Sequence, residues 1–263
     1  MATWQVWVSG LGAGLALMVA TWLASLVRRD ASLIDRVWGL SFVVLAWTYA
    51  VLADVWTSRT WLALALVTIW GLRLSIYLTW RNWGKGEDAR YRDLRTKRPG
   101  TFAVRSLVTI FVLQGVIAWV VSVPLLAATA FDAPAELIWL DWIGAAMWLA
   151  GFVFEAGGDW QLSRFLADPA NRGKVMDRGL WRYTRHPNYF GDATVWLAFG
   201  LIGLSTGAWW GLIGSLAMGV TIVTFSGVAL TEKNMSASDS KREGYDEYVR
   251  RTNAFFPGPR VDA

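Results

Sequence analysis

Residues 179–192 read Gly-Leu-Trp-Arg-Tyr-Thr-Arg-His-Pro-Asn-Tyr-Phe-Gly-Asp and run directly into an apolar segment. The stretch contains His186, the only histidine of the chain, beside two arginines, two tyrosines, an asparagine and an aspartate. Helices that cross membranes usually begin with aromatic and apolar residues at the interface. Guanidinium, imidazole and amide groups at such a position indicate a polar ligand. We therefore predict that this stretch holds a charged cofactor at the cytosolic mouth of a membrane protein.

The composition is that of an integral membrane protein. Of 263 residues, 55% are hydrophobic and 19 are tryptophans, whereas soluble domains are about 45–50% apolar and indole rings favour the membrane interface. The chain has no cysteine, which excludes disulfides and thiolate chemistry, and with a single histidine we predict no metal site. The net charge of +5 is explained by basic cytosolic loops, so we predict no nucleic-acid partner.

Seven segments are apolar enough to cross a bilayer, whose core of about 30 Å needs about 20 helical residues. They lie at 5–27, 37–53, 61–80, 107–130, 137–157, 189–204 and 208–230. The first segment lacks a basic region before it, so we expect a retained helix and not a signal peptide. Gly10 and Gly14 within it permit close helix packing, either within the chain or between chains. The sequence predicts an all-α, polytopic single membrane domain, with substrate-side helices in 1–130 and cofactor-binding helices and tail in 131–263.

The distribution of Lys and Arg predicts the orientation. The first, third and fifth loops and the tail are basic; the second loop has only Arg59, the fourth carries Asp132, Glu136 and Asp141, and the sixth has no charge. Because cytosolic loops are enriched in Lys and Arg, we expect the N-terminus outside and the C-terminus in the cytosol.

Several ionisable residues lie within or beside the predicted spans, where they are costly unless paired or facing a wet cavity. Arg73 and Tyr77 share one helix face; Arg73 either snorkels to the cytosolic interface or lines a polar cavity with Tyr77. Asp35 is either a helix N-cap or a carboxylate that orients a substrate or a tyrosine hydroxyl. Glu155 and Asp159, four residues apart, mark either a solvated helix end or a polar lining that faces the cofactor.

The stretch 179–192 offers the groups that a nucleotide-like ligand needs. Pro187 favours a helix start, whose free backbone N–H groups bind anions. Arg178 and Arg185 can donate to phosphates, His186 and Asn188 supply directed hydrogen bonds, and the nearby tyrosines can stack on a flat ring. In the third predicted loop, 81–92, cations suit phosphates and the Glu-Asp pair could bind sugar hydroxyls or neutralise arginines; a plain basic loop is the simpler alternative.

At these residues the chain resembles a known superfamily. The pattern Gly-Leu-Trp-x-Tyr-x-Arg-His-Pro-Asn-Tyr-Phe-Gly-Asp is similar to the C-terminal signature of the steroid 5-alpha-reductases, and of sterol delta-14 and delta-7 reductases. A shorter version, Arg-His-Pro-x-Tyr, occurs in isoprenylcysteine carboxyl methyltransferases. The nearest resemblance is to a bacterial membrane family that carries the 5-alpha-reductase C-terminal domain. The likeness is strong over 155–257, including Glu232, Tyr245 and Tyr248, and weaker over the first half.

The resemblance implies NADPH held at the cytosolic ends of a seven-helix bundle. By this likeness Asp159 is an acidic cofactor contact, Asn188 binds the nicotinamide end, and Tyr189 and Asp192 follow as in the family. Tyr77 resembles the tyrosine that polarises the substrate carbonyl. The chain departs from the family in lacking a Gln-Glu pair ahead of that tyrosine, and Asp35 is the nearest carboxylate.

The sequence therefore predicts an NADPH-dependent reductase of a conjugated C=C bond in a lipid-like substrate, such as a steroid, sterol, isoprenoid or fatty acyl chain. Its partners would be the bilayer, in a bacterial inner membrane, and a hydrophobic small molecule. The alternatives are an S-adenosylmethionine-dependent lipid methyltransferase and a non-enzymatic lipid-binding or transport protein. The predicted catalytic residues are Tyr77 and Asp35, and the predicted cofactor contacts are Arg90, Tyr91, Asp159, Arg164, Arg172, Arg178, Tyr183, Arg185, His186, Asn188, Tyr189, Asp192, Glu232, Tyr245 and Tyr248.

Overall fold

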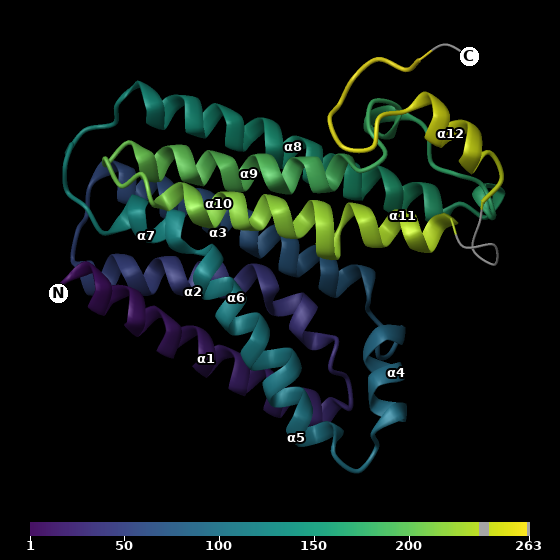
Figure 1. Cartoon of the computed structure of the whole chain (residues 1–263), viewed down its shortest axis with the longest axis horizontal. Coiled ribbons are helices and arrows are strands. Elements are labelled where there is room, and N and C mark those ends of the chain that lie inside the picture. Colours follow the sequence, from purple (N-terminus) through teal and green to yellow (C-terminus); the bar gives the residue numbers. More distant parts are fainter. Residues whose placement is uncertain (237–241, 262–263) are drawn as a thin grey trace. The chain divides into compact units, whose positions relative to one another are not determined.

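The computed structural model describes residues 1–236 and 242–261, and over these residues the chain is helical without a strand, as predicted (Figure 1). An isolated β-bridge joins Lys174 to Glu243. The α-helices are α1 (Thr3–Arg28), α2 (Leu33–Ala53), α3 (Ser58–Arg81), α4 (Ala89–Lys97), α5 (Phe102–Ser106), α6 (Leu113–Val121), α7 (Val123–Thr129), α8 (Trp139–Ala167), α9 (Pro187–Leu204), α10 (Gly211–Val220), α11 (Val228–Ser236) and α12 (Tyr245–Arg251). A π-helical turn at Leu107–Val112 joins α5 to α6, and a second at Thr221–Ser226 leads from α10 toward α11. Two 3-10 turns lie at Pro169–Asn171 and Gly179–Arg182.

Five helical segments in the described part of the chain are long and apolar enough to cross a membrane. They are Thr3–Arg28, Leu33–Ala53, Ser58–Arg81, Phe102–Val121 and Gly211–Lys233. The fifth and sixth predicted spans fall in α8 and α9, which are not among the five. Buried acidic residues in α8 and the polar first turns of α9 lower the hydropathy of both helices. The multi-pass membrane class is therefore supported, while seven spans and their orientation stay predictions.

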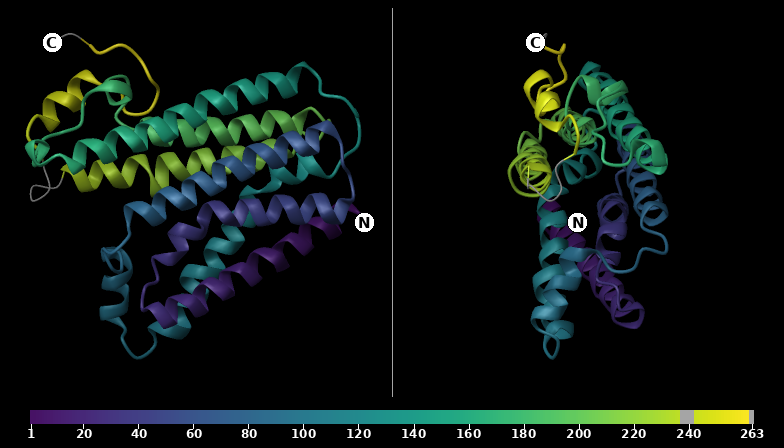
Figure 2. Two further views of the ribbon diagram at one scale, coloured as in Figure 1. Left: turned by 180° about the vertical axis from the view of Figure 1, so that it is seen from behind. Right: turned by 90° about the vertical axis from the view of Figure 1, so that its right-hand side faces the viewer.

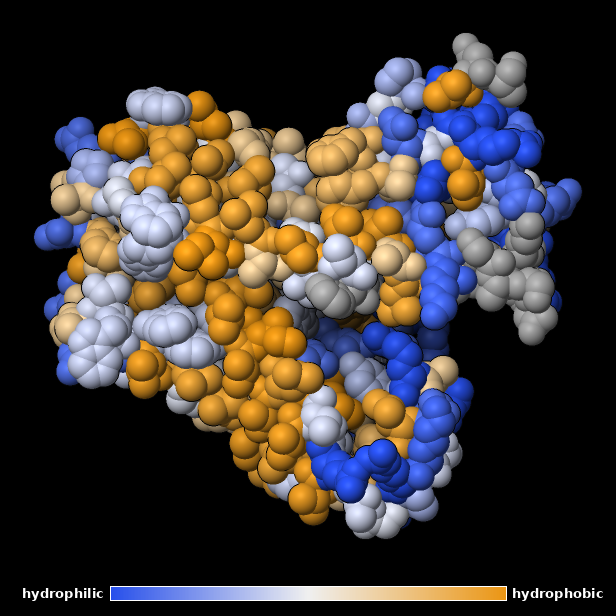
Figure 3. All heavy atoms as spheres, in the orientation of Figure 1, coloured by the Kyte–Doolittle hydropathy of each residue, from blue (hydrophilic) through white to orange (hydrophobic). Residues whose placement is uncertain are grey.

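The contacts within the chain divide it into two units. Unit 1 comprises residues 1–141 and 202–214, and unit 2 comprises residues 142–201 and 215–263. The sequence placed its division between substrate-side and cofactor-side segments at residue 130. In unit 1, the surface over α1 and α6 is apolar and that over α4 is hydrophilic, and in unit 2 the surface around α12 is also hydrophilic (Figure 3).

In unit 1, α2 lies between α1 and α3 and packs on both (Figures 1 and 2). Glycines allow this close approach: a Cβ added at Gly39 would lie 2.5 Å from the carbonyl oxygen of Gly71 on α3. On the other side, Gly10 of α1 packs against the ring of Tyr49, where a Cβ would lie 2.2 Å from the ring carbon Cε1. The predicted packing role of Gly10 within the chain is therefore confirmed.

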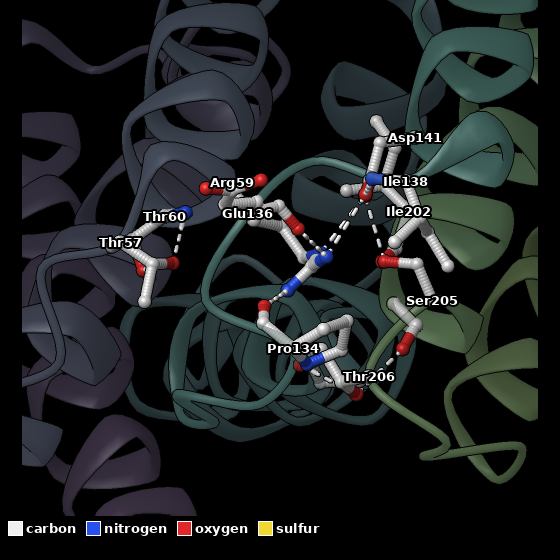
Figure 4. A network of polar contacts seen from close by, with 12 residues as sticks. Thr57, Arg59, Thr60, Pro134, Glu136, Ile138, Asp141, Ile202, Ser205 and Thr206 are labelled. Carbon is white, nitrogen blue, oxygen red and sulfur yellow. Dashed lines mark hydrogen bonds and ion pairs between the residues drawn. The ribbon is translucent and has the colours of Figure 1, made fainter.

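A buried ion pair lies in unit 1, at the end of its helices that is away from the α1–α2 turn (Figure 4). Arg59 lies in the first turn of α3 and not in a loop, and its side chain is 0% exposed. It donates to Asp141 at 2.8 Å from Nε and at 2.9 Å from Nη2, and to the carbonyl oxygens of Pro134 and Glu136. Ser205 Oγ donates to Asp141 Oδ1 at 2.6 Å. Residues that the sequence assigned to two different loops, the second and the fourth, therefore neutralise each other inside the protein.

In unit 2, the residues of α8 and α9 pack almost backbone to backbone. A Cβ added at Gly191 would lie 2.3 Å from the backbone nitrogen of Glu155, and one at Gly151 would lie 2.7 Å from the carbonyl oxygen of Gly191. Small residues on both helices are what permit such contacts. This approach sets the acidic face of α8 directly beside the first turns of α9.

Candidate functional site

The first turn of α9 and the acidic face of α8 form a polar cluster in unit 2. Asn188 Nδ2 donates to Asp159 Oδ1 at 3.1 Å. Asp159 and Glu155 are only 6% and 4% exposed, so they do not mark a solvated helix end, and a polar lining that faces a cofactor stays a prediction. Gly158 makes room, since a Cβ there would lie 3.1 Å from the backbone nitrogen of Asn188.

The amide of Asn188 has an orientation that suits a ligand. Its nitrogen is taken by Asp159, so its carbonyl oxygen Oδ1 points elsewhere, is buried, and has no hydrogen-bond partner among the described residues. Buried polar atoms are satisfied in the great majority of cases. The chemistry that would satisfy Oδ1 is an N–H donor such as a carboxamide.

Arg185 ties the tail of the chain to the start of α9. Its guanidinium donates to Glu232 Oε1 at 2.7 Å and Oε2 at 2.9 Å, and to the carbonyl oxygens of Val249 and Thr252. Its backbone nitrogen donates to Asn253. Arg185 thus binds protein groups on several sides, and Glu232 is the carboxylate that holds it. Phosphate binding by Arg185 stays a prediction, with less of the side chain free for it than the sequence suggested.

His186 is buried between Glu232 and an aromatic ring. Its Nε2 lies 3.1 Å from Glu232 Oε1, and its ring stacks on Tyr189 at 5.5 Å. Burial lowers the pKa of His186, and the hydrogen bond and negative charge of Glu232 only partly oppose this effect. The Tyr189 hydroxyl lies 3.3 Å from Thr231 Oγ1. His186 is therefore best described as a neutral hydrogen-bonding group that helps to orient this cluster.

The other predicted cofactor contacts of unit 2 divide into surface and buried residues. Arg164, Arg172, Arg178 and Tyr183 are exposed; Arg164 lies over the Trp160 ring and Arg178 over the Phe165 ring. Asp192 follows Asn188 by one turn on α9 and is half-buried. Tyr245 and Tyr248 are buried, and the Tyr248 hydroxyl donates to the carbonyl oxygen of Trp181 at 2.7 Å. Tyr248 thus has a hydrogen-bond partner, the backbone of Trp181, that the sequence did not indicate.

A second polar cluster, in unit 1, is centred on Asp35. The N-cap of α2 is Ser32, so Asp35 is not the N-cap that the simpler interpretation required. Its carboxylate accepts from the Tyr91 hydroxyl at 2.7 Å and from Arg90 Nη2 at 2.8 Å. Asp35 thus accepts from a tyrosine hydroxyl, but it is that of Tyr91; its predicted partnership with Tyr77 stays a prediction. Burial, and then the negative charge of Asp35, raise the pKa of the Tyr91 phenol and keep it protonated.

The third predicted loop is folded as α4 and is held against the α1–α2 turn. Glu87 accepts from the backbone nitrogen of Ala31 at 2.8 Å and from Arg95 at 2.7 Å. Burial would raise the pKa of Glu87, but these hydrogen bonds outweigh it and hold that pKa below its usual value. Asp88 caps α4 by accepting from the backbone nitrogen of Arg90. The Glu-Asp pair therefore neutralises arginines, which was the second of its two predicted roles.

Tyr77 lies on α3 between two cations. The guanidinium carbons of Arg73 and Arg81 lie 5.2 and 5.5 Å from the centre of its ring. Arg73 therefore contacts Tyr77 on the same helix face, and a polar cavity lined by the two stays a prediction. The tyrosine that Asp35 contacts is Tyr91, for which the sequence predicted cofactor contact. The sequence held a signal for this contact in Ala-Arg-Tyr-Arg-Asp at 89–93, because Tyr91 is the only aromatic residue in that charged segment.

The fold and these clusters define a class: an all-helical, multi-pass membrane protein with an Asn–Asp pair at one helix start and a tyrosine–carboxylate pair at another. The chain belongs to the family described as "Protein of unknown function (DUF1295)", whose pattern matches residues 21–252 and so includes both clusters. It is similar to an uncharacterized protein of Schizosaccharomyces pombe, with 26% identity over 285 residues that cover 95% of this chain and 79% of that protein. No solved structure matches the chain.

Proposed function

We propose that this protein is an NADPH-dependent membrane reductase that transfers hydride to a conjugated C=C bond of a lipid-like substrate. The observation that carries the proposal is the Oδ1 of Asn188, which is buried and has no hydrogen-bond partner among the described residues, while the amide nitrogen is held by Asp159. The likeness of residues 179–192 to the steroid 5-alpha-reductase signature supports the same assignment. The proposal includes seven spans, a cytosolic C-terminus and a bacterial inner membrane.

The residues of unit 2 fit the chemical groups of NADPH. A nicotinamide carboxamide would donate an N–H to Asn188 Oδ1, while His186 and Tyr189 offer hydrogen-bonding and ring surfaces beside it. The exposed arginines Arg172 and Arg178 would bind phosphates as bidentate donors. When bound, NADPH would supply the hydride, and the protein supplies orientation and exclusion of water.

The residues of unit 1 would stabilise negative charge on the substrate. We assign Tyr77 to donate a hydrogen bond to the carbonyl oxygen that is conjugated with the reduced bond. The cations Arg73 and Arg81 beside its ring favour negative charge developing there. Asp35, held by Tyr91 and Arg90, is a positioning residue in this proposal.

Cofactor binding by the full chain in detergent tests the proposal directly. NADPH is expected to raise the melting temperature, because a ligand at about 100 times its Kd stabilises a protein by about 2.7 kcal/mol. S-adenosylmethionine, which carries no phosphate and a cationic sulfur, is the comparison ligand and is expected to leave it unchanged. Stabilisation by S-adenosylmethionine alone would overturn the reductase in favour of a methyltransferase.

Paired tyrosine substitutions test the assignment of the hydrogen-bond donor. Tyr77→Phe is expected to preserve NADPH-induced stabilisation and to lower turnover of a lipid enone by roughly 10²–10⁴-fold, the usual contribution of a positioned acid. Tyr91→Phe is the matched variant, because it removes the hydroxyl that donates to Asp35. Its effect on turnover should be clearly smaller. Should Tyr91→Phe abolish turnover while Tyr77→Phe retains it, the tyrosine bound to Asp35 is the acid and the assignment of Tyr77 is wrong.

A further inference from the structure

A groove of about 850 Å³ lies in unit 1 and is lined by residues of α1, α2 and α3. Figure 2 shows the ribbons of these three helices, with α2 between α1 and α3. Its walls are mainly aliphatic and include Ala20 of α1, Leu40 of α2, and Leu72 and Ile76 of α3. The volume is in the usual range for small-molecule sites, about 300–1,000 Å³. Leu72 and Ile76 are exposed, and all three helices are candidate membrane spans. In a bilayer this groove would open onto lipid chains.

Among the polar residues of the walls, two have buried donors without a hydrogen-bond partner in the described structure. Arg36 donates from Nη2 to Asp30 at 2.8 Å, but its Nε is buried and has no hydrogen-bond partner within the described residues. Ser75 is 6% exposed, and its Oγ is likewise buried without a partner there. Both residues line the groove. Unsatisfied buried donors cost free energy, so each of these donors would gain from an oxygen acceptor on a molecule in the groove.

The charges around the polar end of the groove favour an anionic molecule. Arg28, Arg29, Arg81 and Lys85 are exposed at the ends of α1 and α3. The neighbouring acidic residues Asp30, Asp35, Glu87 and Asp88 are instead engaged by arginines. Trp80 and Trp83 also line this end of the groove, as indole rings do at lipid head-group depth.

We propose that the groove binds one anionic bilayer phospholipid. Its acyl chain lies along Leu40 and Leu72, an ester carbonyl accepts hydrogen bonds from Arg36 Nε–H and Ser75 O–H, and its head group lies among the exposed cations. Basic residues beside a membrane attract anionic lipid head groups in this way. Asp35 forms its contacts with α4 and does not line the groove. Tyr77 does not line the groove either, so the acyl-chain site is distinct from the two predicted catalytic residues, although Arg81 would face both.

The absence of native cysteine allows a direct test, because one introduced cysteine gives a unique labelling position. Ile76→Cys places a bimane fluorophore at the groove, and Ile69→Cys, also exposed on α3 but outside the groove, is the matched control. Each labelled protein is placed in phosphatidylcholine nanodiscs that contain increasing amounts of brominated phosphatidylglycerol. Quenching at position 76 is expected to saturate at a mole fraction about tenfold lower than at position 69.

The remaining experiments distinguish an anionic phospholipid from other molecules that carry an acyl chain, and they test the roles of Arg36 and Ser75. Brominated phosphatidylcholine and a brominated free fatty acid should quench both positions in simple proportion to their amount. In the Ile76→Cys background, Ser75→Ala or Arg36→Lys should weaken phosphatidylglycerol binding roughly threefold to tenfold, the loss expected for one hydrogen bond; melting temperatures without added lipid report whether these variants fold. Equal quenching at positions 76 and 69, saturation by the fatty acid alone, or unchanged binding in folded Ser75 and Arg36 variants would overturn the proposal.

Discussion

Asn188→Ala is expected to reduce markedly the rise in melting temperature that NADPH causes, while the unliganded protein still folds. The substitution removes the buried oxygen assigned to the carboxamide and the amide that Asp159 orients. Losing hydrogen bonds at such a buried site costs about 1–3 kcal/mol, which is a roughly 5–150-fold weaker Kd. Titration of NADPH with the melting temperature as readout measures the change.

Two further variants make the Asn188 result specific. Asn171→Ala is the matched control, because Asn171 also lies in unit 2 but donates to the carbonyl oxygen of Phe165, away from the Asp159 pair. It should keep the full NADPH response. Asn188→Asp keeps the shape but puts a second carboxylate beside Asp159, so it should bind NADPH as poorly as the alanine variant. Wild-type NADPH affinity in either Asn188 variant would remove the observation on which the proposed function depends.

Arg59→Met is expected to produce the largest loss of stability of any substitution considered. It leaves the fully buried carboxylate of Asp141 without its bidentate partner and frees the carbonyl oxygens of Pro134 and Glu136 (Figure 4). Breaking a buried ion pair by removing one partner costs about 3–5 kcal/mol. The measurement is the free energy of unfolding, or the melting temperature, of the detergent-solubilised protein.

Lys97→Met provides the control for Arg59→Met. Lys97 pairs with Asp93 one turn away on α4, where the side chains are 67% and 57% exposed. Exposed pairs of this kind contribute about 0.3–0.5 kcal/mol, so its melting temperature should hardly change. The double variant Arg59→Met with Asp141→Leu should lose less than the sum of the single losses, because it no longer buries an unpaired charge. Equal effects of Arg59→Met and Lys97→Met would show that the buried pair is not a stabilising element.

Much of the candidate site in unit 2 could be predicted because its residues are close in sequence and its helix starts are locally encoded. Pro187 begins α9, and the polar residues next to it share one turn, so their grouping needed no tertiary information. Pairing with α8 was partly predictable, since Glu155 and Asp159 share a helix face. The roles of Arg185 and Tyr248 were not predictable, because their partners lie about 50 to 70 residues away in the sequence. Arg185 binds Glu232 and Thr252, and Tyr248 binds Trp181.

The Asp35 cluster shows more clearly the same limit of prediction from the sequence. The sequence showed that a carboxylate near the start of a membrane helix needs a partner, because burying a charge is costly. It could not show that the partner is Tyr91, 56 residues further along, because α4 had been interpreted as a basic loop.

The sequence by itself predicted the helical membrane class, seven apolar segments of which five correspond to candidate spans in the described structure, and the polar stretch 179–192, since hydropathy and residue type are local properties. The tertiary structure alone decided which charges meet: Arg59 with Asp141, Asp35 with Tyr91, and Arg185 with Glu232. It also decided which buried donors and acceptors lack a partner within the part of the chain that the structure describes, among them those of Asn188 in one unit and of Arg36 and Ser75 in the other. The physical reason is that a charge or a hydrogen bond is satisfied by distance and direction, and helix packing fixes both between residues that are far apart in sequence.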